Sequence, residues 1–360
     1  MSRVVNFCAG PCTLPESVLA EVAAELLDFR GTGMSVVELS HRSAAYEEVH
    51  HDALDRFRRF FDVPEDFDIL FLQGGATLAF SLVPMNLLLP GQSAGYVSSG
   101  TWGRGALKDA SVYGDAYTAW DGRALGYARM PSVDELEVRD GSAYLHVTSN
   151  ETIEGIRLPS MPDAHLPLVV DMSSDFLTRR LPWDRLDVVY GGAQKNLGPA
   201  GLVVLVVRRT VLERPVPPLG SYLSLAAQAA KDSLLNTPPM FSIYVMGKVL
   251  AWLDEQGGID GVEQRADQRS RRVYDAVDSS GGFYSGPAEP AYRSHMNIVF
   301  RLPSPDLESQ FLAEAAAEGM VNLAGHRSVG GVRASLYAAM SDEGVDRLVG
   351  FMGGFAEAHG

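Results

Sequence analysis

The sequence predicts an α/β protein that has a large domain and a smaller C-terminal α/β domain. A length of 360 residues allows two domains, or one large domain with a smaller companion. Short apolar runs of strand length alternate along the chain with longer stretches of helical periodicity. Polar residues follow directly on several of the apolar runs, which is where open α/β sheets bind their ligands.

The first part of the chain begins with an irregular arm at residues 6–15, in which Gly10-Pro11 forms a turn. Pro15 suits the first position of a helix, which we expect to run to about Phe29. A second helix begins near Ser43, and we interpret its His50 and His51 as structural residues rather than metal ligands. The further elements expected up to residue 170 are strands at 69–72, 94–97, 143–147 and 166–170, and a helix at 77–89 that Pro84 bends.

The chain is organised around the loop at residues 190–201, Tyr-Gly-Gly-Ala-Gln-Lys-Asn-Leu-Gly-Pro-Ala-Gly, which joins apolar runs at 186–190 and 202–207. Both runs are typical of buried strands, so we expect the loop to hold Lys195 away from bulk water. Desolvation lowers the pKa of an ammonium group, and a neutral amine can attack a carbonyl carbon. The alternative is an ordinary solvated loop lysine, so a catalytic Lys195 needs support from other residues.

Three further features provide that support, and each has a plainer alternative. The strand at 69–72 runs through Gly74-Gly75 into a helix whose first N–H groups can bind phosphate, although an ordinary strand–helix turn has the same pattern. Trp102 is flanked by small residues, so it can cover a planar ring or fill a core. Asp171 ends the strand at 166–170, either as a functional acid or as a common loop acid.

The C-terminal part predicts helices at 241–256 and onward to 277, strands at 297–302 and 332–337, and helices at 306–318 and 342–358. Alternation in the last strand places Arg333 on the face opposite Val332. Gly330-Gly331 is compatible with a two-residue hairpin turn. Arg333 can share a site with His326 and Arg327 only if these two residues lie in a loop.

Composition excludes some classes of partner. The formal net charge of −15 argues against nucleic acid or an anionic membrane surface. Arginines can still bind an anionic substrate locally, because salt screens charges over roughly 8 Å. We expect a cytoplasmic location, since neither a membrane-span pattern nor a signal-peptide pattern is visible. Cys8 and Cys12 lack further ligands nearby, so we expect reduced thiols and no metal site.

A desolvated lysine, a strand-end acid, an aromatic platform and a phosphate-binding turn are together what pyridoxal phosphate requires. The sequence also resembles the phosphoserine aminotransferase family, which consists of fold-type-I pyridoxal-phosphate enzymes, over essentially the whole chain. The resemblance rests on Leu-Ser-His-Arg at 39–42, Gly-Gly-Ala-Thr at 74–77, Thr-Trp-Gly at 101–103, Ser-Asn-Glu-Thr-Ile-Glu-Gly at 149–155, Gly-Ala-Gln-Lys-Asn-Leu-Gly-Pro-Ala-Gly at 192–201, Asn-Thr-Pro-Pro at 236–239 and Gly-His-Arg-Ser-Val-Gly-Gly-Val-Arg-Ala-Ser at 325–335.

This resemblance implies a large cofactor-binding domain at 16–258 with a mainly parallel mixed sheet flanked by helices. It also implies a small domain at 259–360 and an N-terminal arm at 1–15 that joins the small domain. Pyridoxal 5'-phosphate would form a covalent aldimine with Lys195, and Asp171 would pair with the ring nitrogen; these are the expected catalytic residues. The expected cofactor-binding residues are Ala76, Thr77, Trp102, Thr152, Asp171, Gln194, Lys195, Asn236 and Thr237. The expected substrate-binding residues are His41, Arg42, His326, Arg327 and Arg333, and no metal is implied.

By the same resemblance, Asn236 and Thr237 would reach the cofactor phosphate of the other subunit in a homodimer. His41 and Arg42 would likewise cross the interface and, with His326 and Arg327, hold the substrate phosphate or the side-chain carboxylate of glutamate. Arg333 would hold the α-carboxylate, since a guanidinium matches carboxylates and phosphates. Some members have arginine where Thr77 stands, so the strength of phosphate selection is open.

The implied activity is reversible amino transfer between L-glutamate and 3-phosphohydroxypyruvate in serine biosynthesis. The products are O-phospho-L-serine and 2-oxoglutarate, and a related substrate leads to 4-phosphohydroxy-L-threonine in pyridoxine biosynthesis. One alternative is the same fold with another substrate, as in a serine–glyoxylate type aminotransferase or a desulfurase. A second alternative is a non-catalytic nucleotide-binding protein, which leaves Lys195 and Asp171 unexplained.

Overall fold

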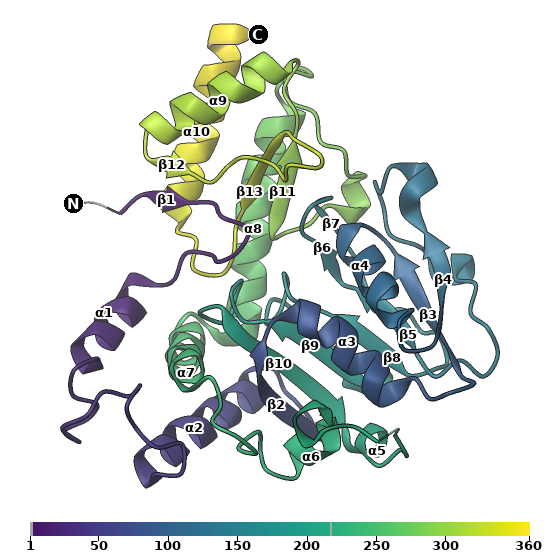
Figure 1. Ribbon diagram of the computed structural model, residues 1–360. Helices are drawn as coiled ribbons and strands as arrows, with labels where there is room; N and C mark the ends of the chain where they lie inside the picture. The colour runs from purple at the N-terminus through teal and green to yellow at the C-terminus, as the bar shows by residue number, and fades with distance from the viewer. Residues whose placement is uncertain (1–2, 217) are drawn as a thin grey trace.

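The computed structural model describes residues 3–216 and 218–360, and its centre is one seven-stranded sheet (Figure 1). The strands in spatial order are β2 (Phe67–Gly74), β10 (Gly201–Arg208), β9 (Val188–Gly192), β8 (Leu168–Asp171), β5 (Leu145–Thr148), β3 (Ser93–Ser98) and β4 (Asp115–Asp121). Every pair from β4 to β9 is parallel, whereas β10 runs antiparallel to β9 and β2. The predicted mainly parallel mixed sheet is therefore confirmed.

Helices cover both faces of this sheet (Figure 1). One apolar core contains residues of α1 (Glu16–Glu25), α2 (Ala44–Phe60) and α7 (Met240–Glu255). The other core contains residues of α3 (Ala76–Leu87), α4 (Thr101–Ala110), α5 (Arg209–Leu212) and α6 (Leu225–Ala229). Strand β10 contributes to both cores, because its successive side chains point to opposite faces: Val204 belongs to the first core and Leu205 to the second.

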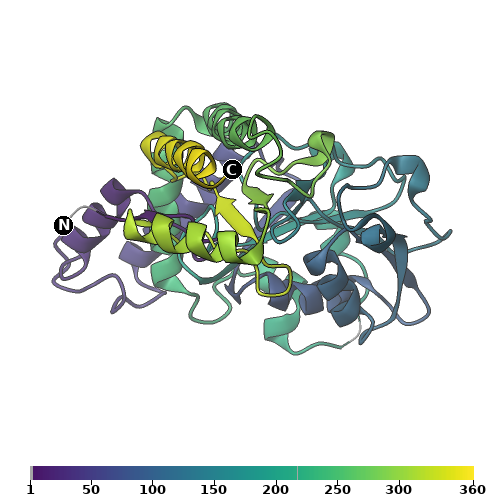
Figure 2. The ribbon, with the colours of Figure 1, turned by 90° about the horizontal axis from the view of Figure 1, so that it is seen from above.

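The C-terminal part packs as a separate apolar core. Its helices are α8 (Gly258–Asp278), α9 (Pro305–Ala317) and α10 (Asp342–His359), and Figure 2 shows them grouped around short strands. These strands are the antiparallel pair β11 (Asn297–Phe300) and β13 (Val332–Ser335), and the parallel pair β1 (Val5–Asn6) and β12 (Met320–Val321). The described part of the N-terminal arm thus pairs with the C-terminal region. Residues 1–2 of the predicted arm lie outside the described residues.

Short elements complete the chain. A hairpin is formed by β6 (Asn150–Glu151) and β7 (Ile156–Arg157). The 3₁₀ helices are η1 (Gly122–Leu125), η2 (Val133–Glu135), η3 (Trp183–Arg185), η4 (Ser221–Leu223) and η5 (Pro290–Tyr292). Of the helices in residues 3–216 and 218–360, none combines the length and the apolar character that a membrane crossing demands.

Most predicted elements lie within a few residues of the observed ones, and two differences have physical causes. Helix α1 ends at Glu25 rather than near Phe29, because the chain turns to bury Phe29 against Tyr244, with ring centroids 5.7 Å apart. Helix α4 was not predicted, since its start contains glycines and depends on carboxylates from distant residues. The domain boundaries at 15/16 and 258/259 stay a prediction.

Candidate active site

The predicted site lies where the parallel strands end. Strand β5 ends at Thr148, β8 at Asp171 and β9 at Gly192, and the three strands are neighbours that run in one direction. A cavity of about 110 Å³ opens at this edge. It is lined by Gly75, Ala76, Thr77, Trp102, Thr148, Asn150, Asp171, Ser173, Ser174, Gln194 and Lys195. The carboxyl edge of the sheet therefore gathers six of the residues predicted from the sequence.

Lys195 is buried at the floor of this cavity, with 8% of its surface exposed. It lies in the loop between the antiparallel strands β9 and β10, as predicted. Its Nζ donates a hydrogen bond of 2.7 Å to Thr152 Oγ1 and lies 5.8 Å from the centroid of the Trp102 ring. Burial lowers the pKa of Lys195 to about 8, against an opposing effect of the Asp171 charge. Much of this lysine is therefore neutral slightly above neutral pH.

Asp171 is the buried acid of the site. Ser173 donates to its Oδ1 twice, from the backbone N at 2.9 Å and from Oγ at 2.6 Å. Burial raises the pKa of Asp171, while these hydrogen bonds and the charge of Lys195 act in the opposite direction. Both bonds from Ser173 end on Oδ1, which leaves Oδ2 for a cationic or N–H partner in the cavity.

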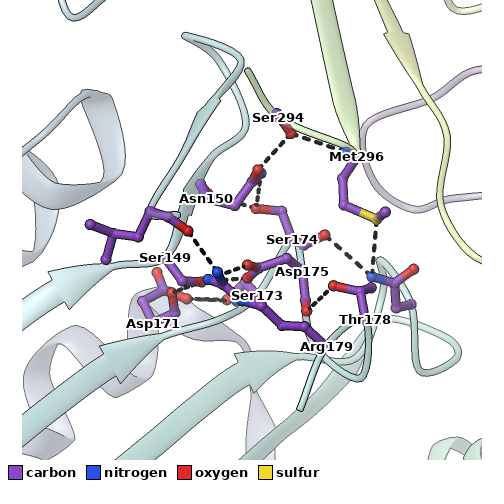
Figure 3. Close-up of polar contacts among 12 residues, drawn as sticks. Ser149, Asn150, Asp171, Ser173, Ser174, Asp175, Thr178, Arg179, Ser294 and Met296 are labelled. Atoms are coloured by element: carbon purple, nitrogen blue, oxygen red, sulfur yellow. Dashed lines mark hydrogen bonds and ion pairs between the residues drawn. The ribbon is translucent and has the colours of Figure 1, made fainter. Parts of the chain in front are cut away.

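A polar network behind Asp171 fixes the loop that follows β8 (Figure 3). Ser149 donates to the carbonyl of Asp171 at 3.1 Å and to the carboxylate of Asp175. Asp175 in turn pairs with the buried Arg179 at 3.0 Å. Asn150 Nδ2 donates to Ser174 Oγ at 2.8 Å. The network therefore holds the ends of β5 and β8 in one geometry and limits the movement of Asp171.

Helix α3 begins at the rim of the cavity and presents Ala76 and Thr77 to it. The first N–H groups of a helix have no partner within the helix, and no side chain among the described residues caps this one. Gly74 has φ +121°, and a Cβ there would lie 2.8 Å from Leu78 Cδ2, so this tight turn requires glycine. Gln194 lines the same cavity. The predicted phosphate-binding layout is thus present beside Lys195.

Arg333 lies on β13, half-buried, and its charge is close enough to contribute to lowering the pKa of Lys195. His326 and Arg327 lie in the loop before β13, as their sharing of a site with Arg333 requires. His326 Nδ1 and Ser328 Oγ are 2.7 Å apart. None of these three residues lines the cavity itself. They lie in the C-terminal part of the chain.

His41, Arg42, Asn236 and Thr237 also do not line the cavity. His41 Nδ1 lies 3.1 Å from Thr237 Oγ1, and Gln73 Nε2 donates to the Thr237 carbonyl at 2.5 Å. Asn236 Nδ2 approaches Gln73 Oε1 at 3.5 Å. These residues form their own group beyond the end of β2, and Arg42 is exposed there. Within one chain the predicted residues thus lie in three places: around the cavity, in and before β13, and beyond the end of β2.

Sequence reasoning missed how closely the N-terminal arm approaches the lysine. The backbone N of Cys12 donates to the Gln194 carbonyl at 2.9 Å, and its Sγ donates to the carbonyl of Lys195. A Cβ on Gly10 would lie 3.4 Å from Lys195 Cγ. It also missed Thr148, Asn150, Ser173 and Ser174 as lining residues. Their position directly after predicted strands was the available signal for them.

The residues present fit pyridoxal phosphate. Thr148 Oγ1 and Trp102 Nε1 are buried and lack a hydrogen-bond partner among the described residues, although both side chains line the cavity. A bound polar ligand would supply such partners. The donor set also matches the cofactor, since it offers a lysine amine, an acid for the ring nitrogen, an indole face and helix N–H groups for phosphate.

Comparison with known proteins agrees with this geometry. The family model described as "Aminotransferase class-V" matches residues 4–348. A phosphoserine aminotransferase of Lysinibacillus sphaericus is 44% identical over 99% of both chains. The solved phosphoserine aminotransferase of Bacillus circulans subsp. alkalophilus superposes with a TM-score of 0.97 at 45% identity over 99% of both chains. A PLP-bound phosphoserine aminotransferase of Trichomonas vaginalis gives a TM-score of 0.93 at 34% identity, over 98% of this chain and 100% of its own.

Proposed function

Because this chain belongs to the class V aminotransferase family, we propose that it transfers an amino group reversibly between L-glutamate and 3-phosphohydroxypyruvate. The products are O-phospho-L-serine and 2-oxoglutarate. The chain is a pyridoxal-phosphate-dependent transaminase with the cofactor carried on a lysine, for which we propose Lys195. The observation that carries the proposal is the buried Lys195 amine, which donates a hydrogen bond to Thr152 and shares one cavity with Trp102 and Asp171.

When bound, the cofactor supplies an electron-withdrawing ring that makes the substrate Cα–H acidic. Lys195 Nζ would accept that proton from Cα and would give it back in the reverse half-reaction. The lowered pKa of Lys195 permits both transfers near neutral pH. Asp171 would hold the ring nitrogen in its protonated form through Oδ2, and that cation would compensate the burial of the carboxylate. Trp102 would cover the ring, and Thr152 would contact its 3-oxygen side.

The phosphate of the cofactor is proposed to lie at the start of α3, where the N–H groups of Ala76 and Thr77 and the helix dipole favour an anion. Gln194 would join this contact from the lysine loop. Thr77 carries no charge, so the substrate phosphate depends on other residues. We therefore assign recognition of the substrate phosphate to His326 and Arg327.

We assign the binding of the anionic groups of the substrate to Arg333, His326 and Arg327. Arg333 holds the α-carboxylate, and the loop pair His326 and Arg327 holds the distal phosphate or carboxylate. Because the net charge is −15, this local positive group has to attract anions against a negative surface.

We further propose a homodimer in which His41, Arg42, Asn236 and Thr237 complete the site of the partner subunit. Their grouping away from the Lys195 cavity of their own chain supports this assignment. The segment before His41 also exposes large apolar side chains, including Leu27, Met34 and Val37. An exposed apolar group of this kind favours burial by a second chain. The cytoplasmic location and the use of the pyridoxine-pathway substrate stay predictions.

The alternatives from the sequence are less well supported. A desulfurase needs a reactive thiol. Burial raises the pKa of Cys12 to about 12, and Cys12 Sγ donates a hydrogen bond to the Lys195 carbonyl, so this thiol is not activated. A nucleotide-binding protein would use the start of α3 for phosphate, but this role does not explain why Lys195 is buried in the cavity.

The proposal predicts a ping-pong exchange that can be tested in halves. Holoenzyme given glutamate alone should release about one 2-oxoglutarate per chain and stop, and added 3-phosphohydroxypyruvate should then yield about one phosphoserine per chain. Mass spectrometry of the quenched mixture measures both. Failure to release 2-oxoglutarate would reject glutamate as the donor, and failure of the second half would reject the acceptor.

A further inference from the structure

Two carboxylates of the β6–β7 turn, which we define as residues 150–154, cap the start of α4. Glu151 Oε2 accepts the backbone N–H of Trp102 at 3.0 Å, and Glu151 Oε1 accepts that of Gly103 at 2.9 Å. Glu154 Oε1 accepts the backbone N–H and the hydroxyl of Thr101, at 2.8 and 2.7 Å. The first three N–H groups of α4 are therefore held by side chains that lie about fifty residues away in the sequence.

The local backbone is built for this contact. A Cβ on Gly100 would lie 2.6 Å from Glu151 Cδ and 2.6 Å from Glu154 Oε2, so a side chain at position 100 would displace both carboxylates. Ser99 Oγ is a third donor to the Glu151 carboxylate, bonded to Oε1 at 3.0 Å. Glu151 itself has no measurable exposure. Its carboxylate is thus fully enclosed and bonded through both oxygens.

The same turn also contacts the lysine. Thr152, directly after Glu151, accepts the hydrogen bond from Lys195 Nζ. Asn150, directly before Glu151, is fixed by Ser174 Oγ and by Ser294 Oγ, at 2.8 and 2.5 Å, as Figure 3 shows. The turn is therefore anchored on one side, and it connects the helix that carries Trp102 to the amine beneath the Trp102 ring.

We propose that Glu151 is a positioning residue of the transamination site, which fixes the backbone of Trp102 so that the indole lies over the cofactor plane beside Lys195. Burial and the nearby Glu154 raise the pKa of Glu151, and the N–H donors of α4 oppose this increase. Both oxygens of Glu151 accept hydrogen bonds, so the geometry at the start of α4 matches the carboxylate form. The inference rests on the proposed function only in the role given to Trp102.

Two matched substitutions separate the contacts. In Glu151→Gln, one carboxylate oxygen becomes an NH₂ group, which then faces the N–H of Trp102 or of Gly103, so one helix contact is lost. In Glu154→Gln, the amide oxygen can keep both bonds from Thr101, because Glu154 Oε2 has no partner among the described residues. Each substitution replaces one carboxylate of the same turn with an amide of nearly the same size.

The test uses the apoenzyme and needs no substrate. Hydrogen–deuterium exchange in Glu151→Gln should increase in peptides spanning 99–104 and stay at the wild-type level in β8 and β9, and the Kd for pyridoxal phosphate should rise about tenfold. The visible circular dichroism of the bound cofactor should also change. Glu154→Gln should keep the wild-type exchange in peptides spanning 99–104.

Two results would overturn the inference. One is wild-type exchange and wild-type cofactor affinity in Glu151→Gln, and the other is increased exchange across the whole sheet, which would indicate a general folding role. If Glu151→Gln does not fold, Ser99→Ala removes one donor from the same carboxylate. It should shift both measurements by a smaller amount, and no shift would equally reject the inference. A protein that shows these shifts but no glutamate activity would reject the proposed function alone.

Discussion

Lys195 differs from the other lysines of the chain in its surroundings. Lys108 and Lys231 are exposed, and the half-buried Lys248 on α7 pairs with Glu21 and Glu25. Only Lys195 combines burial, a hydroxyl partner and a nearby indole ring, among the residues that the structure describes. Its reactivity therefore follows from the fold around it.

Lys195→Ala should abolish covalent cofactor binding. Borohydride reduction of the wild-type holoenzyme should fix the cofactor to the peptide that contains residue 195, and peptide mass spectrometry should detect none in the variant. Lys248→Ala serves as the control, because Lys248 pairs with Glu21 and Glu25 and does not line the cavity. Retention of a reducible visible absorbance in Lys195→Ala would assign the cofactor to another amine.

The lowered pKa of Lys195 predicts how cofactor loading depends on pH. Because the pKa is about 8 instead of 10.5, the reactive neutral amine becomes the major form above about pH 8. The loading rate of apoenzyme should therefore rise with pH through about 8 and then level off. Asp171→Asn removes a charge that raises the Lys195 pKa, so its midpoint should move to lower pH. A midpoint near 10 in both proteins would show a solvated lysine.

The buried pair Asp175–Arg179 should matter far more to stability than a surface pair. Asp175→Ala leaves the Arg179 charge buried and unpaired, so the free energy of unfolding should fall by about 3–5 kcal/mol. Asp62→Ala, which removes an exposed partner of Arg180, should cost at most about 1 kcal/mol. Denaturant unfolding of the apoenzymes measures both, and equal losses would contradict the structural role given to the network behind Asp171.

At the scale of elements, six of the seven strands of the central sheet were predicted, whereas the edge strand β4 and helix α4 were not. Residues 202–207 of β10 are all apolar because both faces of this strand are buried, and this composition is visible in the sequence. Asp171 was found at the end of such a run, whereas Thr148, Asn150, Ser173 and Ser174 were missed although they lie at the ends of two of these runs. Helix α4 instead depends on Glu151 and Glu154, and no local pattern around Trp102 indicates carboxylates from so far along the chain.

The start of α3 gives a prediction for phosphate binding. Thr77→Asp places a negative charge where the cofactor phosphate is proposed to lie, so the Kd for pyridoxal phosphate should rise about tenfold or more. The Kd for pyridoxal, which lacks the phosphate, should change little. Thr77→Ser keeps a hydroxyl and is the matched control. Equal losses for pyridoxal and pyridoxal phosphate would place the phosphate elsewhere.

At the scale of the whole molecule, the positions of His41 and Arg42 are compatible with the proposed homodimer. The sequence resemblance assigned His41 and Arg42 to a partner subunit, and in the structure they lie outside the cavity of their own chain. Residues such as Leu27, at 89% exposure, leave apolar surface nearby. Which residues of a second copy meet this surface depends on packing between chains, which no pattern within one sequence encodes.

Shared sites predict complementation between two inactive variants. Lys195→Ala and Arg42→Ala should each be nearly inactive alone. Co-expressed, they should form mixed dimers in which one site has both Lys195 and the Arg42 of the partner subunit. A random mixture should recover about a quarter of the wild-type activity, since half of the dimers are mixed and each has one complete site. No recovery, in dimers shown to be mixed, would place Arg42 in the site of its own chain.

The most direct test of the proposed function compares two acceptors with glutamate as donor. The ratio of kcat/KM for 3-phosphohydroxypyruvate to that for hydroxypyruvate isolates the contribution of the substrate phosphate. One or two charge-assisted contacts from His326, Arg327 and the partner subunit's Arg42 predict a preference of about a hundredfold or more for the phosphorylated acceptor. Equal kcat/KM values for the two acceptors would contradict the proposal.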